Sequence, residues 1–451
     1  MIFPGKRRIA TLNRQSVLTQ LDGILLYGPF ALLMFGPLAF GAVEPWSMLI
    51  LEVGSILLLL LWIAREYLTN GINIHPNPLF LPMLVFAGLV FIQIIFGLSA
   101  SRSDTVSQAL LYFAYGMLSF VVTQTMQRSS QARRVATLLV IYGIAIAAFA
   151  LLQGVAPNGK IYWLRVPRLG GRIYGPYVNH NHYAGLMEML VPIPLVVALS
   201  RLAPEKTRIA AGVAAAIMVG TVFLSGSRGG MISVFAELAV LTVICFRQKR
   251  SLRIAMGVAA FAVVLVSMLV WLGGKELTST VGSISTEARG EISGGTRVSI
   301  AKDGVRMFAR RPVLGWGLGS FPVMYPHFRS FYTNFFVNEA HNDYVQLLAE
   351  MGILGFGTML WFLAATFGHG RRKIAKWTTE VSGAATLACT LGVIGILLHS
   401  LVDFNLQIPA NAALFYVFCS ITAAPPMLQR SRRPKPAPPH EEELFPTSEV
   451  V

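Results

Sequence analysis

Long apolar runs separated by short polar stretches make up most of the chain. Each run is close to the about 20 residues that an α-helix needs to cross the hydrocarbon core of a bilayer. We count about twelve such runs and expect a membrane-spanning helix in each. The pattern therefore predicts an all-α polytopic membrane protein. The expected spans are residues 24–43, 46–63, 79–98, 106–122, 135–153, 182–200, 209–224, 229–246, 254–272, 341–367, 382–401 and 408–424.

The composition agrees with this pattern. Hydrophobic residues are 54% of the 451-residue chain and charged residues only 13%, against about 25% charged in an average soluble protein. This excludes a soluble globular enzyme, a disordered protein and a nucleic-acid-binding domain. The three cysteines all lie inside apolar runs, so no disulfide framework is indicated.

The net charge of +16 has to be compared with the order of the expected spans. Most of the lysines and arginines fall in alternate connections, beginning with the N-terminal segment. Since cytoplasmic connections carry the excess of basic residues, this predicts that both termini are cytoplasmic. An even number of spans agrees. One long external segment, about 273–340, is expected between the ninth and tenth spans, and the Pro- and Glu-rich tail 430–451 is expected to be disordered.

The remaining basic residues fall on the external side. One guanidinium group can bind two phosphate oxygens at once, so the cluster of arginines favours an anion site with phosphate as the natural ligand. For any single arginine, contact with lipid head groups, or translocation of a long segment regardless of charge, explains its position equally well. The external basic residues are Arg102, Lys160, Arg165, Arg168, Arg172, Arg228, Lys275, Arg289, Arg297, Lys302, Arg306, Arg310, Arg311 and Arg329.

Three external features surround these cations. The loop 171–183 combines Gly and Pro with Asn179 and Asn181, either of which suits the start of a helix. Arg228 lies in a short Gly-Ser-Arg-Gly-Gly turn, where backbone amides at a helix start and a guanidinium could hold one phosphate. In the long segment, a polar Gly/Ser-rich stretch, 282–295, precedes a helix of about 296–310. One side of that helix is apolar, typical of a helix that lies along a membrane surface; this side holds Val298, Ala301, Val305 and Phe308.

His341 opens the tenth expected span. Helical spacing puts Asp343, Gln346 and Glu350 on one stripe with His341 at its outer end. A histidine at the water boundary suits a general base, and a capping or packing role is an equal alternative. Asp403, in the short turn before the last span, could pair with an external arginine, and we favour a structural salt bridge there.

A metal site is not expected. His180, His182, His327 and His341 show no metal-ligand spacing, and zinc requires convergent ligands. The external side also has few carboxylates to hold Mg²⁺ against a diphosphate. If a diphosphate is bound, arginine is the expected counter-charge.

Together these motifs resemble the O-antigen ligase family, whose shared core is the Wzy-C domain. The core corresponds to about residues 209–357, and the loop 172–181 and the turn 403–406 are similar to the family's flanking pieces. Ligases, O-antigen polymerases and protein O-oligosaccharyltransferases share this core. The matching strings are LSGSRGG at 224–230, Arg297 with RPVLGWG at 311–317, HNDYVQ at 341–346 and EMG at 350–352.

The resemblance implies a metal-independent glycosyltransferase without a cofactor. It implies an enzyme of the bacterial inner membrane whose site faces the periplasm and which takes a glycan from undecaprenyl diphosphate. The acceptor would be lipid A–core oligosaccharide in a ligase, the favoured reading, or another glycan in a polymerase. The family's essential residues fall on Arg172, Arg228 and His341. Arg297, Arg306, Asn181, Asp343 and Tyr344 are expected to line the substrate site.

The resemblance also divides the chain. Residues 1–208 would be N-terminal helices, 209–357 the family core with its external segment 273–340, 358–429 the last helices, and 430–451 the tail. A secondary transporter is a weaker alternative, because transporters place polar sites near the bilayer midplane within repeated halves. Here the charges gather at the outer ends of the spans, and no internal repeat is visible. A lipid-diphosphate flippase would need cations along a transbilayer path.

Overall fold

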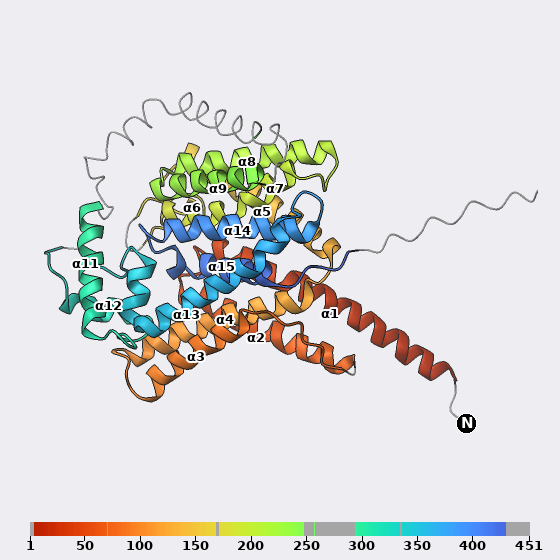
Figure 1. Ribbon diagram of the computed structural model, residues 1–451, viewed down its shortest axis with the longest axis horizontal. Coiled ribbons are helices and arrows are strands. Elements are labelled where there is room, and N and C mark those ends of the chain that lie inside the picture. The colour runs from red at the N-terminus through yellow and green to blue at the C-terminus, as the bar shows by residue number, and fades with distance from the viewer. Residues whose placement is uncertain are drawn as a thin grey trace, which may run out of the picture.

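The computed structural model is a bundle of long helices, drawn in Figure 1. It describes residues 4–69, 71–167, 171–247, 257, 294–333 and 336–429. Within these ranges no β-sheet forms, and the few strand-like pairs are isolated bridges. The helices are α1 (Pro4–Leu38), α2 (Pro45–Leu68), α3 (Phe80–Ile95), α4 (Arg102–Thr125), α5 (Ser129–Val155), α6 (His180–Leu190), α7 (Pro192–Leu199), α8 (Glu205–Ser225), α9 (Arg228–Arg247), α11 (Gly294–Arg310), α12 (Phe321–Met324), η1 (Tyr325–His327), α13 (Asp343–Ile374), α14 (Val381–His399), η2 (Asn405–Gln407) and α15 (Pro409–Ala423).

The expected spans coincide with helices wherever the structure describes them. Nine helical segments of the described chain are long and apolar enough to cross a membrane, and α3 and α15 are shorter apolar helices. The sixth expected span is divided into α6 and α7 next to Pro192. The span 254–272, the Gly/Ser-rich stretch up to residue 293 and the tail from 430 lie outside the described residues. The all-helical fold is thus confirmed, while the count of twelve spans and their sidedness stay predictions.

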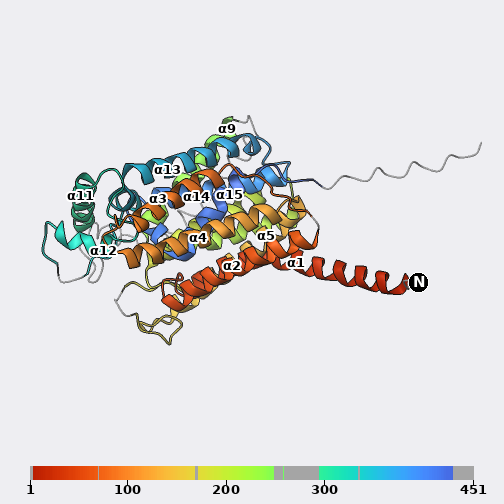
Figure 2. The same cartoon turned by 90° about the horizontal axis from the view of Figure 1, so that it is seen from below.

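The long helices run side by side, and α11 stands across one end of them (Figures 1 and 2). We call this the α11 end; it also holds the first residues of α6, α9 and α13. At the opposite end Arg14 donates a hydrogen bond to the Leu68 carbonyl, and Asn77 donates one to the Ser420 carbonyl at 3.0 Å. The loops that carry the candidate site residues therefore share one end of the bundle.

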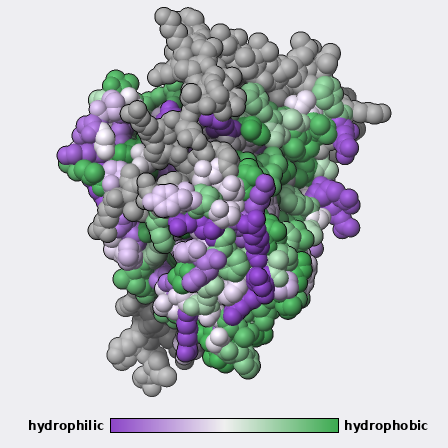
Figure 3. Space-filling model, turned by 90° about the vertical axis from the view of Figure 1, so that its left-hand side faces the viewer, coloured by the Kyte–Doolittle hydropathy of each residue, from purple (hydrophilic) through white to green (hydrophobic). Residues whose placement is uncertain are grey.

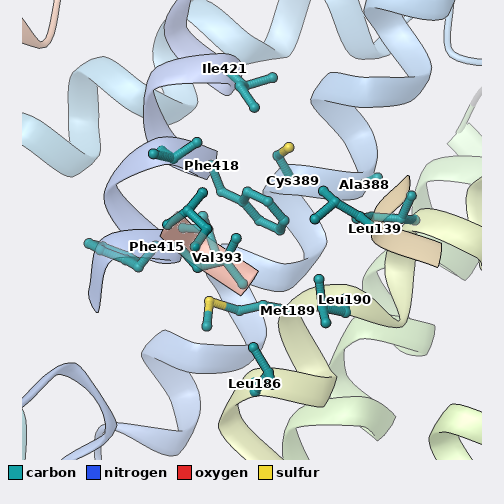
Figure 4. Close-up of a cluster of buried hydrophobic side chains, with 14 of the residues drawn as sticks. Leu139, Leu186, Met189, Leu190, Ala388, Cys389, Val393, Phe415, Phe418 and Ile421 are labelled. Carbon is teal, nitrogen blue, oxygen red and sulfur yellow. The ribbon is translucent and has the colours of Figure 1, made fainter. Parts of the chain in front are cut away.

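The centre of the bundle is formed by α6, α14 and α15. Every residue of α15 is buried, and apolar side chains from these helices and α5 interlock around Phe415 and Phe418 (Figure 4). Small residues are frequent in α14 and α15, which lets helix backbones approach closely within a membrane. All three cysteines lie in the described part of the chain, are buried and form no disulfide.

Helix α13 is interrupted at Gly352, whose φ of 63° and ψ of −166° are not helical. Backbone groups freed by the interruption pair with the loop 311–317 instead of with the helix. The loop and α13 approach so closely that glycine is required on both. A Cβ on Gly352 would lie 2.7 Å from the Leu314 nitrogen, and one on Gly315 would lie 2.6 Å from the Met351 nitrogen. The bonds are Ile353 N to Pro312 O (2.8 Å), Leu354 N to Val313 O (3.3 Å), Trp316 N to Ala349 O (3.0 Å) and Gly317 N to Glu350 O (2.9 Å).

Helix α11 confirms the helix expected from residue 296 to 310 and packs through a second stripe. Ile300 and Met307 are buried and belong to a small core with Phe321 and Tyr325. Val298 and Val305, from the apolar side named above, are exposed instead. Because α11 lies across the ends of the long helices (Figure 1), it has the orientation expected of a helix along a membrane surface.

Candidate active site

Asp403 is the centre of a buried polar cluster at the α11 end. Its side chain has no exposed surface, and its Oδ2 accepts a hydrogen bond from Asn181 Nδ2 at 2.7 Å. Oδ2 also lies 3.6 Å from Arg297 Nη1, and Oδ1 lies 3.4 Å from His341 Nδ1. We call Asp403, His341, Arg297 and Asn181 the Asp403 cluster. It joins four segments that are far apart in the sequence.

The surroundings of Asp403 determine its charge. Burial alone would raise the pKa of its carboxyl group. The His341 imidazole, 3.4 Å away, and the positive charge of Arg297 outweigh burial and hold that pKa well below its usual value. Asp403 is therefore ionised at neutral pH and provides a fixed negative charge beside the imidazole. The salt bridge expected between Asp403 and an external arginine is confirmed in Arg297.

His341 is nearly enclosed. Its exposure is 8%, and its φ of 50° is a backbone conformation that non-glycine residues rarely adopt. Its ring meets the Phe404 ring edge-on, with the centroids 4.8 Å apart, and His182 meets Phe404 in the same way at 4.7 Å. Phe404 thus lies against both imidazoles and, with Asp403, determines the orientation of His341.

The start of α13 is bound to the turn that carries Asp403. The Asn342 side chain caps the helix by accepting hydrogen bonds from the backbone of Tyr344 and Val345, and its amide donates to the Leu401 carbonyl at 2.8 Å. The Asp343 carboxylate accepts hydrogen bonds from Leu406 N and Gln407 Nε2, each at 3.1 Å. These contacts fix the segment before α13, and therefore His341, against the turn.

Arg172 and the turn before Arg228 are in contact. The Arg172 guanidinium lies on Gly226, where an added Cβ would be 2.9 Å from Nη1. Gly226 ends α8 with a φ of 77°, and the Ser227 hydroxyl caps α9 by accepting from Gly230 N at 3.2 Å. Both arginines are exposed, and neither forms an ion pair with another residue in the described ranges. They remain available to an external anion.

Several other external arginines are held by the protein itself. Arg165 pairs with Glu44 at 2.5 Å and lies over the Phe40 ring. Arg306 pairs with Asp303 at 2.9 Å, and Arg311 lies over the Trp316 ring. Arg168 and Arg289 lie outside the described residues. The arginine-rich external segments thus contain two kinds of cation, and Arg172 and Arg228 belong to the kind without a protein counter-charge.

The stripe predicted along α13 is buried, and its groups bind the protein. The Gln346 side chain accepts a hydrogen bond from Ala340 N at 2.9 Å. The Glu350 carboxylate accepts hydrogen bonds from Gly319 N (2.9 Å) and Phe321 N (3.1 Å). The Tyr344 hydroxyl donates to the Leu397 carbonyl at 2.6 Å. Like Asp343, these residues attach neighbouring segments to α13: the external segment through Gln346 and Glu350, and α14 through Tyr344.

His399 lies between the turn that carries Arg228 and the turn that carries Asp403. The edge of its ring lies against Gly229, where an added Cβ would be 2.5 Å from Nε2, and its carbonyl accepts a hydrogen bond from Asp403 N at 3.1 Å. The structure therefore brings the Arg172–Arg228 pair and the Asp403 cluster to neighbouring positions. Arg306, by contrast, makes its described contacts on α11 alone. Figure 3 views this end directly and shows hydrophilic side chains down the middle of the face, flanked by apolar ones.

Sequence reasoning missed His399, its partner Glu188 and the ring of Phe404. The signal for Glu188 was available, because an acidic residue within an apolar span is costly unless it has a partner. His399 ends α14 four residues before Asp403, and Phe404 follows Asp403 directly, but nothing in their spacing indicates which groups they contact. Within the described residues, no three His, Cys, Asp or Glu side chains converge as they would to hold a metal ion.

Two comparisons with known proteins bear on this site. A search of curated proteins finds no match to the chain. The family model described as O-antigen ligase matches residues 213–360, close to the core expected at 209–357. This stretch contains Arg228, Arg297, His341 and the interlocked strings around Gly315 and Gly352. Residues 213–360, about a third of the chain, therefore match the O-antigen ligase family, and that family implies ligase- or polymerase-like glycosyltransferase activity. The long apolar helices of the described residues agree with a multi-pass membrane protein.

Proposed function

We propose that the protein transfers a glycan from undecaprenyl diphosphate to an acceptor hydroxyl at the periplasmic face of the bacterial inner membrane. The acceptor is lipid A–core oligosaccharide, which makes the protein an O-antigen ligase. The observation that carries the proposal is the pairing of a buried carboxylate–imidazole couple, Asp403 with His341, with two arginines that have no protein counter-ion in the described chain. A base and an anion site side by side suit transfer from a phosphate leaving group.

His341 acts as the general base. With Nδ1 directed at Asp403, the other ring nitrogen is left to take the proton from the acceptor hydroxyl as that hydroxyl attacks the anomeric carbon. The ionised Asp403 stabilises the imidazolium that forms. Direct attack on the anomeric carbon inverts its configuration.

Arg172 and Arg228 bind the diphosphate. When the bond between the anomeric carbon and the phosphate oxygen breaks, the electron pair stays on that oxygen and the diphosphate gains negative charge. Guanidinium groups and the first amides of α9 stabilise this charge. The prenyl tail remains in the bilayer, so the donor enters laterally between helices. Arg297 holds Asp403 in place. Asn181, Asp343 and Tyr344 hold the segments that surround the proposed substrate. Arg306, which is exposed on α11, is proposed to face the substrate.

The test is glycan transfer from a purified lipid-linked donor in detergent. Arg228→Ala and Arg172→Ala are each expected to lower the rate about 10²-fold, because each removes a charge that faces the leaving group. Arg228→Lys keeps the charge but loses the paired hydrogen bonds, and is expected to stay well below wild type. Arg102→Ala, an exposed arginine at the same end of the bundle, is the control and should keep full activity.

Near-normal transfer by both alanine variants, with the protein still in the membrane, would refute the assigned roles. A protein that moves a solute between two compartments and transfers no glycan in detergent would be a transporter instead. The product separates the family's activities: a discrete core-linked species marks a ligase, and a lengthening ladder on the carrier lipid marks a polymerase.

Removing divalent metal should leave the reaction intact. In the proposed mechanism arginines neutralise the diphosphate, so the transfer rate in excess EDTA is expected to stay within about twofold of the untreated rate. A Mg²⁺-dependent reaction would instead lose most of its rate in EDTA, because there the ion supplies the neutralising charge. Dialysed protein with and without added Mg²⁺ gives the comparison. A loss on chelation that Mg²⁺ restores would contradict the arginine assignment.

A further inference from the structure

A second carboxylate–imidazole pair lies beneath the anion site. His399 Nδ1 is 3.2 Å from both carboxylate oxygens of Glu188. The two side chains are 1% and 0% exposed. They come from α14 and α6, two of the helices at the centre of the bundle. A carboxylate enclosed within a membrane protein requires a counter-charge or hydrogen bonds, so this pair is costly to maintain and its position needs an explanation.

The ring of His399 spans the distance from Glu188 to the first turn of α9. One nitrogen faces Glu188, and the Cδ2–Nε2 edge lies against Gly229, immediately after Arg228. Any side chain at position 229 would displace this edge, since an added Cβ would be 2.5 Å from Nε2. The imidazole therefore reaches the same helix start whose backbone amides and Arg228 are proposed to bind the diphosphate.

We propose that His399, held by Glu188, is a further anion-binding residue that supplies a third positive group to the diphosphate beside Arg172 and Arg228. This inference rests on the proposed function. Glu188 orients the ring and supplies the counter-charge that an imidazolium requires when it is buried. The buried ring acts through its positive charge beneath the first turn of α9. The proton of the acceptor hydroxyl goes to His341. As the glycosidic bond breaks, the imidazolium stabilises the electron pair left on the phosphate oxygen.

The experiment measures binding separately from transfer. The probes are farnesyl diphosphate and farnesyl monophosphate, titrated against the detergent-solubilised full-length protein. His399→Gln keeps a hydrogen-bonding group of similar reach without the charge. It is expected to weaken diphosphate binding about 10- to 100-fold, because the positive charge beneath the anion site is lost. It should also reduce the preference for diphosphate over monophosphate and leave transfer impaired.

Glu237→Gln is the matched control. Glu237 lies two turns further along α9 and packs against Gly395 rather than Gly229, so its change should leave diphosphate binding as in wild type. If His399→Gln fails to fold, Glu188→Gln tests the same pair without altering the ring, and is expected to weaken diphosphate binding in the same direction.

The possible results are distinct. Wild-type diphosphate affinity in folded His399→Gln and Glu188→Gln, with Arg228→Ala defective, would overturn this inference and leave the proposed function intact. Equal loss in Glu237→Gln would also overturn it, because the effect would then not depend on the helix start. A wild-type protein that neither binds the diphosphate nor transfers glycan would instead reject the proposed function.

Discussion

Replacing Asp403 with asparagine is expected to lower glycan transfer by about 10²- to 10⁴-fold, as much as His341→Ala. Asparagine keeps the volume of the side chain but removes the charge that lies 3.4 Å from His341 Nδ1. The imidazole then loses the group that orients it and stabilises its protonated form. Arg297 loses its counter-charge as well. The measurement is the transfer rate from a lipid-linked donor at saturating acceptor.

Asp104→Asn is the control, since Asp104 lies at the same end of the bundle and bonds Ser101. A transfer rate for Asp403→Asn within about threefold of this control would remove Asp403 and His341 from the chemistry, because it would fall far short of a general-base effect.

Asp403→Asn and the wild type should also differ in how their stability depends on pH in acid. The pKa of Asp403 is lowered in the folded protein, so its ionised form stabilises the fold above the ordinary aspartate pKa of about 3.9. That contribution is lost as the pH falls toward the lowered pKa. Thermal unfolding below about pH 4 should therefore be less pH-dependent in Asp403→Asn than in wild type.

Gly352→Ala is expected to cause the largest loss of stability. The φ of 63° at this position costs a non-glycine residue about 1–3 kcal/mol. The added Cβ would also collide with the backbone of Val313 and Leu314. Relief of that collision would move the loop 311–317 away from the interruption in α13. Transfer should fall with stability, because the loop and the start of α13 position His341. The unfolding temperature in detergent and the yield of folded protein measure the effect.

Gly357→Ala, in the same helix, is the matched control. Its added Cβ would meet nothing within 4 Å, and alanine favours a helix more than glycine does, so the variant should be at least as stable as wild type. Equal unfolding temperatures for the two variants would show that the interruption at Gly352 does not hold the segments together.

The helices were predictable because their apolar runs are long and the polar connections short. Every span that the structure describes coincides with its expected range, since hydrophobic length alone is a strong signal in a membrane protein. The interruption at Gly352 was not predictable. A glycine inside an apolar helix is common, and the loop that pairs with this one lies more than thirty residues earlier in the chain. Long-range backbone pairing leaves no periodic trace.

The site was predicted in part. His341, Arg172 and Arg228 were expected at one end of the bundle, and the structure brings their segments together through His399 and Asp403. The central position of Asp403 was not predictable, since its contacts with Asn181 and Arg297 depend on how four segments meet. The hydrogen-bond partners of Asp343 and Tyr344 were not predictable either. A polar stripe at a helix start has the same sequence pattern whether it binds a substrate or a neighbouring segment of the protein.

The position of Phe404 has a consequence for side reactions. Activated glycosyl diphosphates can be consumed by hydrolysis as well as by transfer, and a base open to bulk solvent would favour hydrolysis. Phe404 lies edge-on against the His341 ring, and the imidazole is only 8% exposed. The enclosed ring leaves little room for water beside the acceptor. In the proposed mechanism, the enclosure of His341, to which Phe404 contributes one side, therefore favours transfer over hydrolytic loss of the donor.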